Sequence, residues 1–130
     1  MRDAEAKLRE MALAYPEAYE EFPWGERVAK VRKKVFLFLY ATDDRLHVTA
    51  KLPHSATIAL MQPWAQPTGY GLGRAGWVTA TFEWGGEPPP LEMLREWIDE
   101  SYRARAPREL VARLDAVARL DAVEAPKPSA

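Results

Sequence analysis

Apolar side chains recur along this chain with two different spacings. Near the N-terminus Leu8, Met11 and Tyr15 follow one another at intervals of three and four, which predicts an amphipathic helix that ends before Pro16. From residue 19 to residue 52 apolar and polar residues alternate instead, as they do along a strand with one buried face. The pattern therefore predicts a helix followed by a sheet.

The alternating region predicts three antiparallel strands. They are expected at Val28–Arg32, Val35–Tyr40 and Leu46–Leu52. The connections at Lys33-Lys34 and Thr42–Asp44 are short enough for hairpins, although Lys-Lys is not a pair that tight turns favour. We expect a meander whose apolar face is covered by the N-terminal helix and by a later one.

A short helix is expected within residues 53–62. Ser55 can cap its N-terminus, and Ile58 and Met61 are spaced three residues apart, which predicts that both face inward. Pro63 then ends the helix, because proline cannot continue it.

The remainder of the chain predicts one clear strand and two helices. Trp77–Trp84 alternates between apolar and polar residues and is bounded by glycines and prolines, as strands are. Leu91–Tyr102 carries a wide apolar stripe at helical spacing, and Pro107 opens a further helix. Within that last helix Arg113–Val117 recurs as Arg119–Val123, at an interval of six that matches no helical repeat. We interpret the second copy as an extension of the helix.

Together these elements predict a single α+β domain, an antiparallel β-sheet covered by helices. The expected order is a helix, three strands, a short helix, two strands and one or two final helices. A chain of 130 residues is large enough for one hydrophobic core. We assign residues 1–123 to this domain and residues 124–130 to a flexible tail.

The composition excludes several classes of site. The chain has no cysteine and only two histidines, so we expect no disulfide, no metal and no cofactor. No apolar run approaches the roughly 18 residues that span a bilayer, and no apolar segment follows the charged N-terminus. We therefore expect a cytoplasmic protein without a membrane partner. Asparagine is absent and there are 11 prolines, a composition typical of thermophile proteins.

A local excess of cations is the main candidate for a binding site. Basic residues crowd the first predicted hairpin, and two later ones could extend the same surface: Arg27, Lys30, Arg32, Lys33, Lys34, Lys51 and Arg74. A projecting basic hairpin can follow DNA phosphates, but a net charge of −1 means that such binding must be local. The alternative is that the lysines only keep an exposed edge hairpin from aggregating.

The segment Gly71–Gly76 fits the pattern G-x-G-x-x-G of dinucleotide-binding loops. That motif follows a strand and opens a helix, whereas this segment follows a proline-broken loop and precedes a strand. We therefore expect no bound nucleotide, and at least one of these glycines with a positive φ. Arg74 at the tip of the loop could still contact a phosphate, because exposed amides and a guanidinium together attract anions.

The tryptophans divide into core and surface candidates. Trp77 opens a strand and Trp97 lies in a helical apolar stripe, so both are expected in the core. Trp24 is flanked by proline and glycine, and it can be either a core residue or a surface aromatic that stacks on bases.

The acidic pair Asp99-Glu100 beside Ser101 could suggest acid–base chemistry. On a helix both carboxylates point away from the apolar stripe, toward Arg95, Arg103 or solvent. No set of nucleophile, base and orienting residue can be assembled from them, so we expect no enzymatic activity.

Several motifs occur in an order that resembles the MmcQ/YjbR family. They are Glu21–Gly25, the basic run that follows it, the apolar run Val35–Tyr40, the glycine-rich Gly69–Gly76 before Trp77–Phe82, and Asp99–Tyr102 at the end of a helix. The resemblance extends from about Leu8 to Leu114. It implies a YjbR-like α+β fold, a predicted DNA-binding function, and packing of the Ser101-Tyr102 pair on the sheet.

Two functions are therefore expected. The first, which the resemblance implies, is weak and largely sequence-independent DNA binding through the basic hairpin. The second is a protein-interaction or chaperone-like module, in which an apolar surface near Trp24 and the Pro63–Pro67 loop docks a peptide or a second copy of the chain. The net charge of −1 favours the second function.

Overall fold

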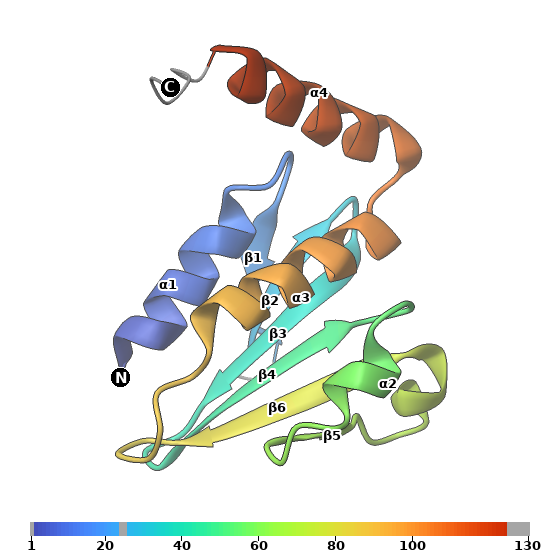
Figure 1. Cartoon of the computed structure of the whole chain (residues 1–130). Helices are drawn as coiled ribbons and strands as arrows, with labels where there is room; N and C mark the ends of the chain where they lie inside the picture. Colours follow the sequence, from blue (N-terminus) through green and yellow to red (C-terminus); the bar gives the residue numbers. More distant parts are fainter. Residues whose placement is uncertain (1, 24–25, 125–130) are drawn as a thin grey trace.

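A six-stranded antiparallel sheet in the order β1-β2-β3-β4-β6-β5 forms the centre of the protein (Figure 1). The computed structural model describes residues 2–23 and 26–124. The strands are β1 (Tyr19–Glu21), β2 (Arg27–Val31), β3 (Lys34–Ala41), β4 (Arg45–Lys51), β5 (Ala65–Pro67) and β6 (Trp77–Glu83). The helices are α1 (Arg2–Leu13), α2 (Ala56–Ala59), the 3₁₀ helix η2 (Leu72–Ala75), α3 (Leu91–Arg105) and α4 (Arg108–Glu124). The predicted α+β class and antiparallel sheet are confirmed.

The predicted order of elements is right except for one strand. β2, β3 and β4 correspond to the three expected strands, but β1 precedes them, so four strands and not three lie between the first two helices. Alternation could not reveal β1, because a three-residue strand of Tyr-Glu-Glu contains no buried position. The backbone of β1 pairs with β2 on one side, and β1 is the first strand in the order of the sheet, so it forms an edge.

The turn of the basic hairpin lies one residue earlier than predicted. Val31 pairs with Lys34, so the turn residues are Arg32 and Lys33, with φ of 49° and 70°. Positive φ at both central residues is the conformation that matches the twist of a two-residue hairpin. In this register Val31 lies opposite Lys34 and is completely buried, whereas a turn at Lys33-Lys34 would place Val31 opposite Phe36, two positions further along β3.

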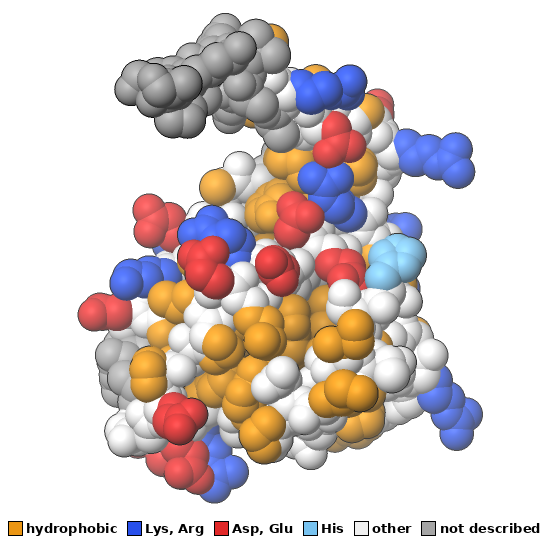
Figure 2. All heavy atoms as spheres, viewed as in Figure 1, with side chains coloured by type: hydrophobic (Ala, Val, Ile, Leu, Met, Phe, Trp, Pro, Cys, Tyr) orange, Lys and Arg blue, Asp and Glu red, His pale blue; other side chains and the backbone are white. Residues whose placement is uncertain are grey.

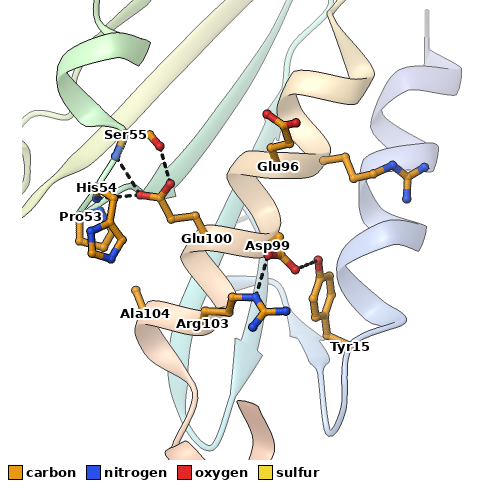
Figure 3. Close-up of a pocket in the computed structure, with 10 residues that line it drawn as sticks. Tyr15, Pro53, His54, Ser55, Glu96, Asp99, Glu100, Arg103 and Ala104 are labelled. Atoms are coloured by element: carbon orange, nitrogen blue, oxygen red, sulfur yellow. Dashed lines mark hydrogen bonds and ion pairs between the residues drawn. The ribbon is translucent and has the colours of Figure 1, made fainter. Parts of the chain in front are cut away.

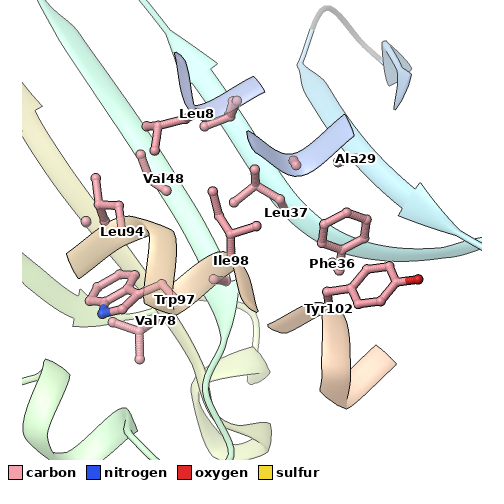
Figure 4. Close-up of a cluster of buried hydrophobic side chains, with 14 of the residues drawn as sticks. Leu8, Ala29, Phe36, Leu37, Val48, Val78, Leu94, Trp97, Ile98 and Tyr102 are labelled. Atoms are coloured by element: carbon pink, nitrogen blue, oxygen red, sulfur yellow. The ribbon is translucent and has the colours of Figure 1, made fainter. Parts of the chain in front are cut away.

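The core lies between the sheet and the helices α1 and α3 (Figure 4). Leu8 of α1 and Ile98 of α3 are fully buried against the sheet residues Leu37 and Val48. Figure 1 shows the two helices lying side by side across one face of the sheet. The apolar stripe predicted for α3 is confirmed, because its buried positions include Trp97 as well as Ile98.

Ser101 and Tyr102 fix α3 to the sheet, as the resemblance implied. The Ser101 hydroxyl donates a hydrogen bond to the carbonyl of Phe36 (2.5 Å) and accepts one from the backbone N–H of Lys51 (2.9 Å). The Tyr102 hydroxyl donates to the carbonyl of Pro16 (2.8 Å). These two side chains connect α3 with β3, β4 and the segment after α1.

The prediction that Ile58 and Met61 face inward is wrong. Both side chains are mostly exposed, at 68% and 75%. The helix α2 has only four residues, and its buried position is taken by Ala59. Trp64 after the helix packs against the core, with its ring centre 5.1 Å from that of Phe82.

The other face of the sheet has no helix packed on it within the described residues. Tyr40 and His47 stack there with ring centres 5.8 Å apart. Hydroxyl groups join Thr49 to Thr79 and Thr79 to Thr68 at 2.9 Å each. The sheet therefore has one packed apolar face and one open face lined by aromatic rings and hydroxyls.

The C-terminal helix α4 lies beyond the end of α3 and away from the sheet (Figure 1). Leu110 in its first turn is buried, whereas Val117 and Leu120 are 50% and 58% exposed. Both copies of the repeated segment lie in this one helix, which confirms the interpretation as a helix extension. Residues 125–130 of the predicted tail lie outside the described residues. None of the helices in the described ranges is long and apolar enough to cross a membrane.

Candidate nucleic-acid interface

Three of the seven candidate cations form ion pairs with carboxylates. Arg27 on β2 binds Glu20 of β1 (2.9 Å), and Lys30 binds Glu21 of the same strand (2.6 Å). Their partners are the acidic residues of β1, the strand that the sequence pattern did not reveal. The charges of Arg27 and Lys30 are therefore largely neutralised by the carboxylates of β1.

Arg32 in the hairpin turn is paired twice. Its guanidinium lies 2.7 Å from Glu17 and 2.9 Å from Glu109 at the start of α4. The hydrogen bond and charge of Arg32 hold the pKa of the Glu17 carboxyl below its ordinary value, and the two carboxylates raise the pKa of Arg32. This arginine attaches α4 to the hairpin and has little charge to offer a phosphate.

The other four candidates lie together at one end of the sheet, which we call the basic end: Lys33, Lys34, Lys51 and Arg74. Antiparallel pairing brings the β2–β3 turn, the end of β4 and the start of β6 to the same end, where Lys51 pairs with Trp77. Arg74 lies in η2, directly before β6. Figure 1 shows these segments along the right side of the sheet.

The cations of the basic end are available to a ligand. Lys33, Lys34 and Arg74 are exposed and Lys51 is half-buried. No ion pair within the described residues involves any of the four. Neighbouring strands lie about 4.8 Å apart, so β3 and β6, on either side of β4, lie about 10 Å apart across the sheet.

One further cation lies at this end, Arg105 at the C-terminus of α3, which was not predicted from the sequence. Its Nε donates to the carbonyl of Val35 (2.9 Å), and its guanidinium lies 5.7 Å from the centre of the Trp77 ring. No motif could have indicated it, because its position depends on how α3 crosses the sheet. Arg105 links the hairpin side of the basic end to the Lys51 side.

The opposite end of the sheet is acidic. It contains the β1–β2 connection, the β3–β4 turn and the segment after β6. The carboxylates there are Glu21, Glu26, Asp43, Asp44, Glu83 and Glu87. A net charge of −1 is thus compatible with a cationic surface, because the two signs are separated along the strand direction.

The glycine-rich loop is shaped by backbone requirements. Gly71 and Gly76 have φ of 78° and 89°, which confirms the prediction of positive φ. A Cβ added at Gly73 would lie 2.8 Å from the Cβ of Pro67, so this position requires glycine for close packing. The loop leads into β6 and holds Arg74 on one turn of 3₁₀ helix.

A pocket with a volume of about 660 Å³ lies elsewhere, between the start of α2, α3 and the end of α1 (Figure 3). In Figure 3 the Glu100 carboxylate points to the start of α2, where it accepts bonds from the backbone N–H groups of His54 (2.9 Å) and Ser55 (3.1 Å). It also accepts a hydrogen bond from the Ser55 hydroxyl (2.6 Å). Glu100 thus caps α2, a role that the sequence did not predict.

Asp99 has a similar structural role in this pocket. It accepts hydrogen bonds from the Tyr15 hydroxyl (2.9 Å) and from Nε of Arg103 (2.7 Å), the latter as predicted. Burial, followed by the bond to Asp99, raises the pKa of Tyr15 well above its ordinary value, so the phenol stays protonated. Arg103 also binds Asp115 of α4 (2.8 Å). The polar groups of the pocket chiefly hold helices together.

The remaining candidates are structural or lie outside the described residues. Trp77 and Trp97 are buried, as predicted. Trp24, the possible surface aromatic, lies outside the described residues. Among the residues that the structure describes, no three His, Asp or Glu side chains come together as a metal site.

Comparison with known proteins identifies the family. A family model described as YjbR matches residues 13–104, which include the whole sheet, the basic end and Ser101-Tyr102. No match was found among curated proteins. The family match covers well over half of the chain. The chain therefore belongs to the YjbR family, as the resemblance to MmcQ/YjbR proteins predicted.

Proposed function

We propose that this protein binds duplex DNA weakly and largely without sequence preference, through phosphate contacts at the basic end. The observation that supports this best is the gathering of four cations from three separate parts of the chain, none of them paired with a carboxylate among the described residues. The resemblance to MmcQ/YjbR proteins implies the same role.

The separation of charge gives the binding a direction. The acidic end is repelled by phosphates while the basic end is attracted, so the protein approaches DNA with the β2–β3 turn and the η2 loop leading. Contacts to phosphates position a protein without reading bases. We therefore expect dissociation constants of about 10⁻⁴ to 10⁻⁶ M at physiological salt, the usual range of non-specific binding.

The test replaces Lys33 and Lys34 together by glutamate and measures binding to labelled duplexes by fluorescence anisotropy over a range of salt concentrations. The double variant should bind duplexes more weakly than the wild type does, and the loss of affinity should be the same for duplexes of unrelated sequence. Its plot of log affinity against log salt should be flatter by about two units, since each lost phosphate contact removes about one.

A matched control separates local from total charge. Lys7→Glu with Arg45→Glu changes the net charge equally, but Lys7 lies on α1 and Arg45 at the acidic end, and both are exposed. This control should bind nearly as the wild type does. Equal weakening by both double variants would show that total charge governs binding and not the basic end. A wild type that fails to bind DNA at low ionic strength contradicts the proposal altogether.

A further inference from the structure

An apolar groove separates α2 from the N-terminal half of α3, on the same side of the sheet as the helices. It consists of two adjoining cavities of about 160 and 150 Å³ that share Gln62 and Met93. Ile58, which is 68% exposed, forms one wall of the first cavity. Figure 2 shows apolar side chains gathered over this region, below the charged side chains that follow α3. We call it the α2–α3 groove.

The floor of the groove is built from aromatic rings. Trp64 lies with its ring centre 5.1 Å from that of Phe82 and 5.7 Å from that of Trp97. Phe82 and Trp97 belong to the core, and Trp64 packs against it. Met93, whose flexible side chain adapts to different partners, lines both cavities above this floor.

The charged residues that line the groove are all acidic. Glu96 and Glu100 line the first cavity and Glu87 lines the second, and no lysine or arginine lines either. Glu100 already caps α2, whereas Glu96 is exposed and forms no ion pair within the described residues. An apolar floor with an acidic rim selects for a ligand that is apolar on one side and cationic at its edges.

We propose that the α2–α3 groove binds a cationic amphipathic helix of a partner protein. Apolar residues of that helix at intervals of three and four would lie over Trp64 and Met93, and lysines or arginines beside them would meet Glu87 and Glu96. This interaction surface is separate from the basic end, and it does not depend on DNA binding.

The backbone of the groove favours a helix over an added strand. Pro88 and Pro90 line the second cavity. Proline has no N–H, so neither residue can donate the main-chain hydrogen bond on which strand addition depends. A helix satisfies its own backbone groups and requires only side-chain contacts from the groove.

A second copy of this chain fits the groove poorly. A two-fold symmetric contact places the same surface on both sides of the interface, so the Glu87 and Glu96 carboxylates of one copy would face those of the other. Like charges brought together in this way oppose association. Duplex DNA is excluded by the same carboxylates.

The experiment uses the full chain and a labelled synthetic peptide of leucine and lysine arranged as an amphipathic helix. Fluorescence anisotropy should show saturable binding of this peptide, and little binding of the matching peptide with glutamate in place of lysine. Ile58→Ser should weaken binding of the lysine peptide by about tenfold, the effect of losing one central apolar contact. Because Ile58 is largely exposed, the folded core is not affected.

Control variants define the site. Leu120→Ser removes an apolar residue of similar exposure on α4, and it should leave the affinity for the peptide unchanged. Glu96→Lys should weaken binding and flatten its salt dependence, whereas Glu10→Lys, an equal change of charge on the exposed side of α1, should do neither.

Three outcomes would overturn the proposal. Equal affinity for the lysine and glutamate peptides would remove the charge argument, and equal affinity of Ile58→Ser and wild type would place the peptide elsewhere. The third outcome is dimer formation by the chain alone, measured by sedimentation. If the chain forms a dimer that Ile58→Ser dissociates, the occupant of the groove is a second copy.

Discussion

At the scale of single residues, Ser101 shows how one hydroxyl can join a helix to two strands. The last pair of the β3–β4 ladder is Leu37 with Ala50, and beyond it the strands separate. The Ser101 hydroxyl bridges the carbonyl of Phe36 and the N–H of Lys51 at this point, and its residue is fully buried. The resemblance predicted that Ser101 packs on the sheet but gave no reason for a serine.

Ser101→Ala should therefore lower the free energy of unfolding, although it removes only one oxygen atom. It leaves a buried carbonyl and a partly buried N–H without partners, which costs about 1–3 kcal/mol for each unsatisfied group. Urea unfolding should show a lower midpoint and an unchanged slope. The control Thr57→Ala removes an exposed hydroxyl from α2 and should change the midpoint little. If the Ser101→Ala variant is as stable as the wild type, the ends of β3 and β4 must move together, so that the Phe36 carbonyl and the Lys51 N–H find other partners.

At the scale of elements, the turn of the β2–β3 hairpin places a charged lysine at a position whose backbone conformation is unfavourable for any residue but glycine. Lys33 has a φ of 70°, a conformation that costs a residue with a side chain about 1 kcal/mol relative to glycine. Lys34, the next residue, is the first of β3 and pairs with Val31. The two lysines therefore have similar exposure and equal charge but different backbone requirements.

Lys33→Gly and Lys34→Gly should accordingly differ in stability and agree in DNA binding. Lys33→Gly should raise the free energy of unfolding by up to about 1 kcal/mol, because glycine adopts positive φ without strain. Lys34→Gly should lower it by about 0.5–1 kcal/mol, because glycine weakens a strand. Each variant loses one cation, so the salt dependence of DNA binding should decrease by about one unit in both. If both variants lose stability, the turn does not lie at residues 32 and 33.

At the scale of the whole molecule, ion pairs connect elements that are distant in sequence. Glu20 of β1 binds Arg9 of α1 and Arg27 of β2, and Glu17 binds Arg32 of the hairpin, which also binds Glu109 of α4. The hydrogen bonds and charges of the arginines hold the pKa values of Glu17 and Glu20 below the ordinary 4.5. Of these cations only Arg32 lies at the hairpin turn, so its pairs with Glu17 and Glu109 remove one charge from the basic end.

The lowered pKa values predict how stability changes in acid. A carboxyl whose pKa is lower in the folded than in the unfolded state stabilises the fold above pH 4.5, and this contribution is lost as pH falls through the folded-state pKa. The double variant Glu17→Gln, Glu20→Gln should therefore melt below the wild type at pH 6, and the difference should shrink as pH is lowered below 4.5. A difference in melting temperature that stays constant between pH 6 and pH 3 would contradict this account.

The helices, most strands and the family could be predicted from local patterns, because periodicity, prolines and glycines act over a few neighbouring residues. The apolar run Val35–Tyr40 favours a strand and Pro107 favours the start of a helix, whatever surrounds them. For the same reason the sequence identified the four cations of the basic end, although not that they would remain unpaired. The register of the hairpin and the strand β1 escaped prediction, since both depend on pairing and not on pattern.

Which charges are unpaired and which apolar residues are buried depends on contacts between elements that are far apart in the sequence. Whether Arg27 is neutralised depends on Glu20 reaching it from the neighbouring strand, and whether Ile58 faces solvent depends on Ala59 taking the buried position of α2. The separation of a basic end from an acidic end likewise results from antiparallel pairing, which collects residues far apart in the chain. A net charge of −1 conceals that arrangement, because a sum over residues carries no information about their positions.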